Sequence, residues 1–351
     1  MVFSKIRNFI FKNLKSFLKK KIIIFESLKV IVGYHYYNKL SHNDDLHIIV
    51  IRGASGDVYL QLLLLNRYLR QENINNYTII GDAPSLRQLA KLFNISDIKI
   101  LPASICNCIE KFYIFSKDKG ENIIIPVCWS STFQFNKCRI KYSSNFKFIE
   151  TYFCFSNNIV YDSILKKPTF INYKNIEKIE YFARQKGIIK NKTILISPEA
   201  NSVTGLPVWF WNSLINDLIA KGYYVFMNCN GFTYYRAPNL FLSYYESVPL
   251  LDYAGGFIGV RSGFCDIIST SKCKKVILYP KIKGKIDFSH HRSDVEYSGL
   301  KVMGLSNGDN LYEIPTLLLK NITDTEYKID DFNEYFQELI ELRKKILEVF
   351  D

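Results

Sequence analysis

Two short runs of branched apolar residues, each followed by a polar turn and an amphipathic helix, constrain this chain most. The first run is Leu46–Ile51, which leads through the turn Arg52–Gly56 into a helix expected over Asp57–Arg70. The second run is Thr193–Ser197, which leads through a polar loop into a helix expected over Val208–Lys221. Apolar strands that alternate with helices are typical of parallel sheets covered on both faces. The sequence therefore predicts an α/β protein with two Rossmann-like, doubly wound units.

Further segments of the same kind extend both units. Other strands are expected at Tyr77–Ile80, Ile98–Leu101, Asn122–Val127, Tyr223–Asn228, Phe257–Val260 and Lys275–Tyr279. Other helices are expected at Pro84–Phe93, Phe264–Ser271 and Asp330–Phe350. Gly222 follows the helix of the second unit and is expected to end it, because glycine readily adopts the left-handed conformation found after helices.

The N-terminal segment is basic and amphipathic. Residues 1–30 hold eight Lys or Arg residues and one acidic residue, a net charge of +7 out of +13 for the whole chain. At helical spacing, its aromatic and aliphatic residues fall on one side and its lysines on the other. This pattern predicts contact with an anionic membrane surface, with packing on the protein's own domain as the alternative. Charge concentrated in a tail, rather than along a groove, does not favour a nucleic-acid partner.

The spacing of the cysteines and of the acidic residues argues against a metal cofactor. The eight cysteines contain no CxxC pair, which disfavours a zinc site, and several lie in apolar runs where a free thiol packs well. We therefore expect a reducing, cytoplasmic setting. The sequence also has no DxD motif, so a divalent cation held by carboxylates is not indicated.

Three segments resemble the heptosyltransferase-type glycosyltransferases, the ADP-heptose:lipopolysaccharide heptosyltransferase family of the GT-B fold. Residues 56–70 (GDVYLQLLLLNRYLR) are similar to the turn and helix that open those enzymes. Residues 194–222 resemble their strand, polar loop and Pro-started helix, and residues 248–280 resemble their helix, strand, Ser-Gly turn, helix and strand ending in Pro. The resemblance implies two Rossmann-like domains that face a cleft, and a transferase with a nucleotide-sugar donor.

The chain departs from that family's pattern at three places. Arg261 stands where the family usually has Asp, and Asp266 stands where it usually has His. Thr204 and Gly205 occupy a stretch that usually holds Lys. The fold prediction survives these changes, but a heptose donor does not follow from the resemblance.

The sequence patterns and the resemblance together divide the chain into four parts. These are a membrane-surface segment at 1–40, an acceptor domain at 41–180, a nucleotide-sugar domain at 181–325 and a C-terminal amphipathic helix at 326–351. The implied function is sugar transfer to a lipid-linked or polysaccharide acceptor, of the lipopolysaccharide or capsule type. The expected location is the cytoplasmic side of the inner membrane, where the protein would be peripheral.

The turn at Arg261, Ser262 and Gly263 is the main candidate for binding the donor. It lies between a strand end and a helix start, where ligands bind in open α/β folds. The amides of Gly263, Phe264 and Cys265 and the guanidinium of Arg261 would favour a diphosphate. The alternative is a capped helix start with an Arg that faces solvent.

Other candidates surround the first turn and the second polar loop. By resemblance, Asp57 is the base that activates the acceptor hydroxyl, whereas an N-cap role would make it a weaker base. Arg52 and Gly56 are expected on the acceptor side. Ser202 and Thr204 are expected to contact the donor phosphate or sugar, and the polar cluster at residues 290–294 is a weaker donor candidate.

Several alternatives stay open. Another GT-B transferase, such as a fucosyltransferase-like enzyme, fits the same segments. A nucleotide-sugar epimerase shares the fold, but its soluble substrate gives no reason for the basic tail. A non-catalytic nucleotide-binding or scaffold protein would explain the missing Lys at Thr204 and Gly205 and the change from Asp to Arg261. A Rossmann oxidoreductase is disfavoured because no GxGxxG follows either opening strand.

Overall fold

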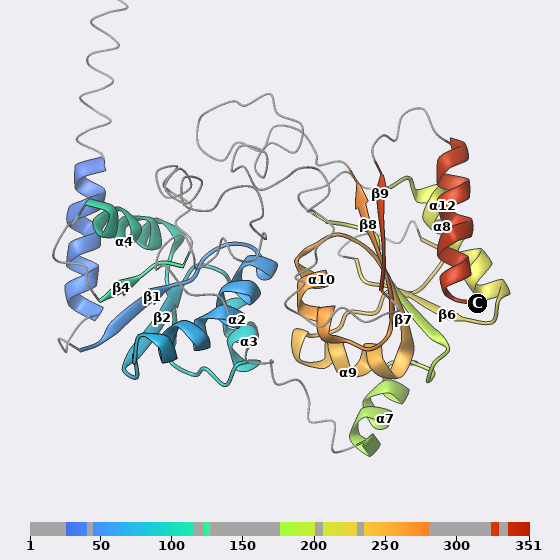
Figure 1. Ribbon diagram of the computed structural model, residues 1–351, viewed down its shortest axis with the longest axis horizontal. Coiled ribbons are helices and arrows are strands. Elements are labelled where there is room, and N and C mark those ends of the chain that lie inside the picture. The colour runs from blue at the N-terminus through green and yellow to red at the C-terminus, as the bar shows by residue number, and fades with distance from the viewer. Residues whose placement is uncertain are drawn as a thin grey trace, which may run out of the picture.

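The computed structural model folds into two α/β halves, each with its own parallel sheet (Figure 1). We call the part before residue 130 the N-terminal half and the part after residue 175 the C-terminal half. The structure describes residues 26–40, 45–115, 122–126, 176–200, 206–229, 235–280, 324–329 and 336–351.

The sheet of the N-terminal half has the strand order β3-β2-β1-β4, and every pair in it is parallel. Its strands are β1 (His47–Val50), β2 (Tyr77–Gly81), β3 (Ile98–Ile100) and β4 (Ile123–Ile124). Its helices are α2 (Ser55–Gln71), α3 (Leu86–Lys91) and α4 (Ala103–Phe115), together with a helix at residues 26–40.

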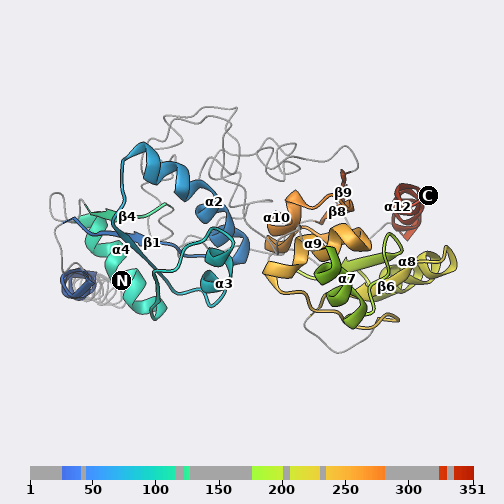
Figure 2. The same ribbon diagram turned by 90° about the horizontal axis from the view of Figure 1, so that it is seen from below.

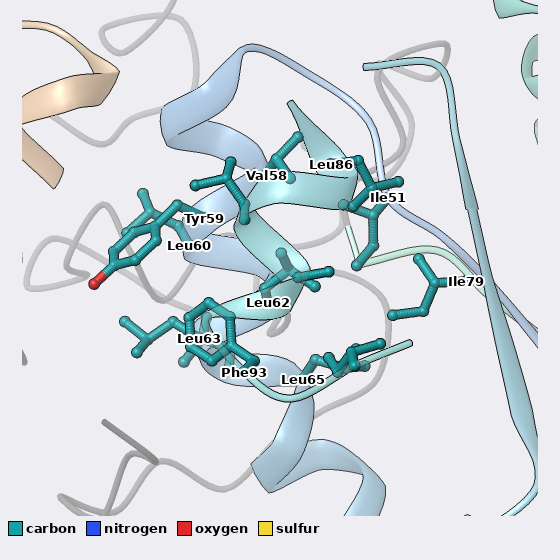
Figure 3. Close-up of a cluster of buried hydrophobic side chains, with 14 of the residues drawn as sticks. Ile51, Val58, Tyr59, Leu60, Leu62, Leu63, Leu65, Ile79, Leu86 and Phe93 are labelled. Atoms are coloured by element: carbon teal, nitrogen blue, oxygen red, sulfur yellow. The ribbon is translucent and has the colours of Figure 1, made fainter. Parts of the chain in front are cut away.

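Alternate side chains of β1 and of Ile51, the residue that follows it, point to opposite faces of this sheet. Ile49 and Ile51 pack with the side chains of α2 and α3, as Figure 3 shows for Ile51. Ile48 and Val50 pack with α4 and the helix at residues 26–40 on the other face. Both sets of side chains are fully buried, because successive side chains of a strand point to opposite faces and helices cover both.

The sheet of the C-terminal half has the order β6-β5-β7-β8-β9, again with parallel pairs. Its strands are β5 (Thr193–Ser197), β6 (Tyr224–Met227), β7 (Gly255–Val260), β8 (Lys274–Pro280) and β9 (Asp324–Ile329). Its helices are α7 (Ile176–Gln185), α8 (Val208–Ala220), α9 (Tyr244–Ala254), α10 (Gly263–Ile267) and α12 (Phe336–Val349), and a 3-10 turn at Ile268–Thr270 continues α10.

Helices also cover both faces of the second sheet. On one face, Ile194 and Ile258 pack with α8 and α12. On the other face, Leu195 and Phe257 pack with α7, α9 and α10. Seen from below, α7 and α9 lie on the side of the sheet away from α12 (Figure 2).

The two halves are in direct contact. The start of α2 lies against α10, and α3 lies against α9, as both ribbon views show. Val248 of α9 and Ile267 of α10 belong to the same buried cluster as Leu62 and Phe93 of the N-terminal half. The halves therefore share part of one hydrophobic core.

Most elements expected from the sequence are present, with shifted ends. The strand at Thr193–Ser197 matches the prediction, and the backbone after α8 turns at Gly222 with φ +85°. The helix expected from Asp57 starts two residues earlier, at Ser55, and the one expected over Phe264–Ser271 is the short α10 followed by a 3-10 turn. The helix α4 and the strand β9 were not expected from the sequence.

The predicted basic helix of the N-terminus lies mostly outside the described residues, which begin at residue 26. Within the described part of the chain, none of the helices has the length and apolar character needed to span a bilayer.

Candidate functional site

The turn between β7 and α10 carries the predicted donor-binding residues. The backbone N–H of Arg261 donates to the carbonyl of Leu278 on β8 at 2.8 Å, which fixes the start of the turn at the sheet edge. Ser262 is the N-cap of α10 and has an extended backbone, and its hydroxyl makes no capping hydrogen bond to the helix. Gly263 then begins the helix. The turn is partly exposed and lies at the carboxyl end of β7, as predicted.

Arg261 forms an ion pair with Asp266. The guanidinium donates from both terminal nitrogens to the two carboxylate oxygens, at 2.7 and 3.0 Å, and also to the carbonyl of Ser262. The Arg261 side chain is 21% exposed and that of Asp266 only 3%. The alternative of an Arg that simply faces solvent is therefore wrong. From the sequence, Asp266 was only a departure from the family pattern, and its pairing with Arg261 was not expected.

Asp266 is a buried acid in a mixed electrostatic environment. Burial raises its pKa to about 6, the neighbouring Arg261 opposes that rise, and the charge of Asp57 adds to it. Burial disfavours a charged carboxylate because the protein interior solvates it poorly. A bidentate guanidinium offsets part of this cost by charge-assisted hydrogen bonds.

The amides at the start of α10 are not all open to a ligand. The N–H of Cys265 donates to the carbonyl of Ser262 at 3.0 Å, so the expectation that this amide faces a phosphate is wrong. Gly263 packs closely on Gly56 of the other half: a Cβ atom added to Gly263 would lie 2.5 Å from the nitrogen of Gly56. The predicted anion site is thus smaller than the sequence suggested.

Asp57 occupies the third position of α2. Its carboxylate accepts a hydrogen bond from the backbone N–H of Ala54 at 2.9 Å, and Ala54 is the residue that caps the helix. The N-cap role considered for Asp57 is therefore wrong, although its carboxylate stabilises the start of the helix by this hydrogen bond. Gly53, with φ +120°, makes this possible, since an added Cβ would lie 2.6 Å from the Cβ of Asp57.

Gln61 of α2 forms hydrogen bonds to the backbone of the turn between β1 and α2. Its buried side-chain amide donates to the carbonyl of Arg52 at 2.6 Å and to the carbonyl of Asp57 at 3.1 Å. These bonds tie the end of β1 to the first turn of α2. The position of the Asp57 carboxylate is therefore set by the backbone on both sides of Gly53.

Arg52 lies in a network of its own. Its guanidinium donates to Asp82 at 2.7 and 3.0 Å, to Asn107 at 2.5 Å and to Glu110 at 3.0 Å. Burial lowers the pKa of Arg52, but Asp82 and Glu110 raise it overall. The sequence predicted an Arg that faces the acceptor, whereas the structure shows an Arg that joins β1 to β2 and α4.

Two partners of Arg52 could have been found from the sequence. Asp82 follows β2 directly, at the same sheet edge as Arg52, and a polar residue at a strand end is typical of a site in an α/β fold. Glu110 is a fully buried acid within the apolar helix α4. An acidic residue within a mostly apolar helix is a signal for a buried ion pair.

The structure brings together residues that lie two hundred positions apart in the chain. Gly56 and Asp57 of the first turn meet Gly263 and Asp266 of α10, while Tyr59 is fully buried beside them. Burial raises the pKa of Tyr59, and the charge of Asp266 raises it further. The contact between the two halves therefore brings the carboxylate of Asp57 close enough to that of Asp266 to raise its pKa, while Arg261 pairs with Asp266.

Some predicted residues cannot be placed. Ser202 and Thr204 lie outside the described residues, as does the polar cluster at residues 290–294. Among the described residues, no group of three or more His, Cys, Asp or Glu side chains is arranged to hold a metal ion. Cys106, Cys108 and Cys265 are free thiols, and all three are buried.

Comparison with known proteins finds similarity in structure rather than in sequence. The chain matches no protein-family model and none of the curated proteins. The E. coli ADP-heptose LPS heptosyltransferase II superposes with a TM-score of 0.52 at 13% identity, over 86% of this chain and 97% of that one. A glycosyl transferase family 9 structure from Veillonella parvula DSM 2008 superposes with a TM-score of 0.50 at 10% identity, over 87% and 95% of the two chains.

These two structures confirm the α/β architecture expected from the resemblance, with two parallel sheets. Nearly the whole length of each of these two structures superposes on this chain. The likeness therefore extends over both halves and is not limited to one Rossmann-like unit. Identity at this level supports the architecture and does not transfer a substrate. The chain has the fold of the heptosyltransferase-type glycosyltransferases, with two parallel α/β sheets joined in a single chain.

Proposed function

We propose that this protein is a glycosyltransferase that moves a sugar from a nucleotide-sugar donor to a lipid-linked or polysaccharide acceptor. The observation that carries the proposal is the contact between the turn before α2 and the turn before α10. Each turn follows the carboxyl end of a parallel strand, which is where ligands bind in this class of fold. A glycosyl donor and its acceptor hydroxyl must meet at such a junction.

The donor is assigned to the C-terminal half. One structural relative is named for ADP-heptose, which supports a sugar activated by a nucleoside diphosphate. We assign Arg261, Ser262 and Gly263 to the donor, together with Ser202 and Thr204. A heptose is not part of the proposal, because Arg261 and Asp266 differ from the residues that the heptosyltransferases usually have there.

The acceptor is assigned to the N-terminal half. In the proposed reaction, Asp57 takes the proton of the acceptor hydroxyl, whose oxygen then attacks the anomeric carbon while the nucleoside diphosphate leaves. The positive charge of Arg261 and backbone amides would balance the charge that develops on the phosphate. Gly56 and Arg52 belong to the acceptor side, where the buried ion pairs of Arg52 hold the turn in place.

We assign no divalent cation to this chemistry. The sequence has no DxD motif, and the residues assigned to the leaving group are a guanidinium, a hydroxyl and backbone N–H groups. Such donors can stabilise a departing diphosphate when they are fixed before the reaction.

We further propose that the protein rests on the cytoplasmic face of an anionic membrane. The helix at residues 26–40 is held on α4 through Gly33, where an added Cβ would lie 2.1 Å from the carbonyl oxygen of Cys108. On its outer side, Leu28 and Ile31 are 52% and 62% exposed. An exposed apolar strip beside a lysine-rich segment suits the boundary between lipid headgroups and acyl chains.

The test of the proposed transferase starts with donor binding. Sugar nucleotides with ADP, UDP, GDP and CDP are screened by thermal shift, because a ligand that binds the native state raises the melting temperature. We expect one class to stabilise the protein. A GDP-sugar would favour the fucosyltransferase-like alternative, and no stabilisation by any sugar nucleotide or free diphosphate would favour the scaffold alternative.

Two variants then separate binding from chemistry. Arg261→Ala should weaken the nucleotide affinity by roughly 10- to 100-fold, the range expected for a lost charge-assisted hydrogen bond, whereas Arg184→Ala on the exposed surface should not change it. Asp57→Asn should keep the affinity and abolish most of the sugar transfer. Unchanged affinity in the Arg261 variant would remove the donor-site assignment.

A further inference from the structure

Asp266 is the only acidic side chain of α10, and it is almost completely buried. A buried carboxylate is costly unless other groups pair with it, so its position calls for a physical reason. Two of its hydrogen bonds come from Arg261, one to each carboxylate oxygen. This bidentate arrangement fixes the plane of the guanidinium as well as its distance.

The same carboxylate also lies against the other half. A Cβ atom added to Gly56 would lie 2.7 Å from one carboxylate oxygen of Asp266 and 2.5 Å from the Cα of Gly263. Gly56 immediately precedes Asp57, so the acid of α10 packs on the backbone that carries the proposed base. Only a residue without a side chain leaves room for this contact.

The charged and titratable groups that face Asp266 come from both halves. Arg261 approaches from the end of β7, Asp57 and Tyr59 approach from α2, and Cys265 precedes it in α10. Of these, only Arg261 favours the ionised carboxylate. Burial and Asp57 together raise the pKa of Asp266 to about 6 despite Arg261. The ion pair is thus complete only above that pH.

We propose that Asp266 is a positioning residue of the transferase site, which orients the guanidinium of Arg261 toward the donor and holds the backbone next to Asp57. This inference rests on the proposed function. It differs from a purely structural role, because a change at Asp266 should alter the behaviour of Arg261 and the pH dependence of the reaction as well as the stability. Asp266 touches neither reacting atom in this proposal.

The first test measures the orientation of Arg261 without any need for activity. Phenylglyoxal modifies accessible arginines, and mass spectrometry of the digested protein reports the rate at Arg261. We expect Asp266→Asn to raise that rate about tenfold, because the loss of the carboxylate charge weakens both hydrogen bonds. The control is Asp252→Asn, because Asp252 is another carboxylate of the same half, which accepts hydrogen bonds from the Ser271 hydroxyl and the Lys272 backbone N–H. An unchanged rate in Asp266→Asn would overturn the proposal.

The second test measures the reaction. Asp266→Asn should lower kcat/KM for sugar transfer by roughly 10- to 100-fold, since a small misplacement of a catalytic group has effects of that size. In the unmodified protein kcat/KM should fall as the pH drops through about 6, and this step should be absent in the variant. A variant that loses thermal stability but keeps the full rate and the pH step would show a structural role only.

The two tests also separate this inference from the proposed function. If Arg261 becomes reactive in Asp266→Asn but no sugar nucleotide binds the unmodified protein, the positioning contact stands and the transferase proposal fails. If sugar transfer occurs but neither Arg261 reactivity nor the pH profile changes in the variant, the transferase proposal stands and the role of Asp266 fails.

Discussion

Gly56 of the N-terminal half and Gly263 of the C-terminal half lie against each other with no side chain between them. The Cβ position of Gly56 is 2.5 Å from the Cα of Gly263, which is closer than side-chain atoms can approach. This contact lies one residue before Asp57 and one residue after Ser262. The separation of the two turns at the candidate site is therefore set by backbone alone.

A methyl group at this contact should separate the halves. Helix propensity predicts that Gly56→Ala would stabilise α2 by about 1 kcal/mol, but the clash with Gly263 opposes it, so we expect a lower melting temperature and loss of sugar transfer. Gly222→Ala is the control, since nothing lies within 4 Å of its Cβ and its φ of +85° adds only a backbone cost of about 1–2 kcal/mol. Differential scanning calorimetry compares them, and a Gly56→Ala protein as stable and active as the parent would contradict the contact.

Removal of Arg52 should destabilise the N-terminal half strongly. Glu110 is fully buried and accepts a hydrogen bond from Arg52 at 3.0 Å, so Arg52→Ala removes the guanidinium that pairs with this buried carboxylate. Breaking a buried ion pair in this way costs about 3–5 kcal/mol. The control Arg184→Ala removes a guanidinium that is 78% exposed and should change stability by less than about 0.5 kcal/mol. Urea denaturation measures both, and equal midpoints would refute the buried network.

Asp266 should make part of the stability depend on pH. Its pKa is about 6 in the folded protein and 3.8 in the absence of structure, so the folded state binds the proton more tightly. This contribution is fully present below about pH 4 and is lost as the pH rises through about 6. The total change approaches ~3 kcal/mol, because one pKa unit corresponds to about 1.4 kcal/mol. The difference in unfolding free energy between the parent and Asp266→Asn, measured from pH 4 to 7, should show it, and a difference that stays flat would exclude it.

Charges on the outer side of the helix at residues 26–40 should weaken membrane binding. Leu28→Glu with Ile31→Glu replaces two exposed apolar side chains by carboxylates, which cannot enter the acyl boundary and are repelled by anionic lipid. We expect a loss of about tenfold or more in the fraction that sediments with phosphatidylglycerol vesicles. Phe241→Glu is the control, because Phe241 is exposed on the C-terminal half. Equal sedimentation of both variants and the parent would argue against this face.

The sequence predicted best those elements whose residues all face the same kind of surroundings. The strand β5 is apolar along its whole length because helices cover both faces, and its bounds came out as expected. The helix α4 was missed because the sheet and the helix at residues 26–40 pack on different sides of it, which leaves little contrast between its faces. The strand β9 was missed because DTEYKI is a polar segment at the edge of the sheet.

The candidate site was predictable in its parts but not in its assembly. Strand ends and glycine turns pointed to Asp57 and to Arg261, and each lies where such a residue is expected. The pairing of Arg261 with Asp266 and the approach of Gly56 to Gly263 depend on how a turn folds back and how two sheets pack. The ion pair depends on the local fold of the turn, and the glycine contact joins residues far apart in the chain, so neither can be read from the spacing of residue types.

Val248 and Ile267 of the C-terminal half are buried in the core of the N-terminal half, so the chain cannot be divided between the halves without exposing apolar surface. A fragment that ends before residue 176 would expose the apolar surface that these two side chains cover, and the complementary fragment would expose Val248 and Ile267 themselves. Neither piece is an autonomous folding unit by this criterion. Co-expressed fragments should instead recover their structure only by assembling with each other, as a split protein does.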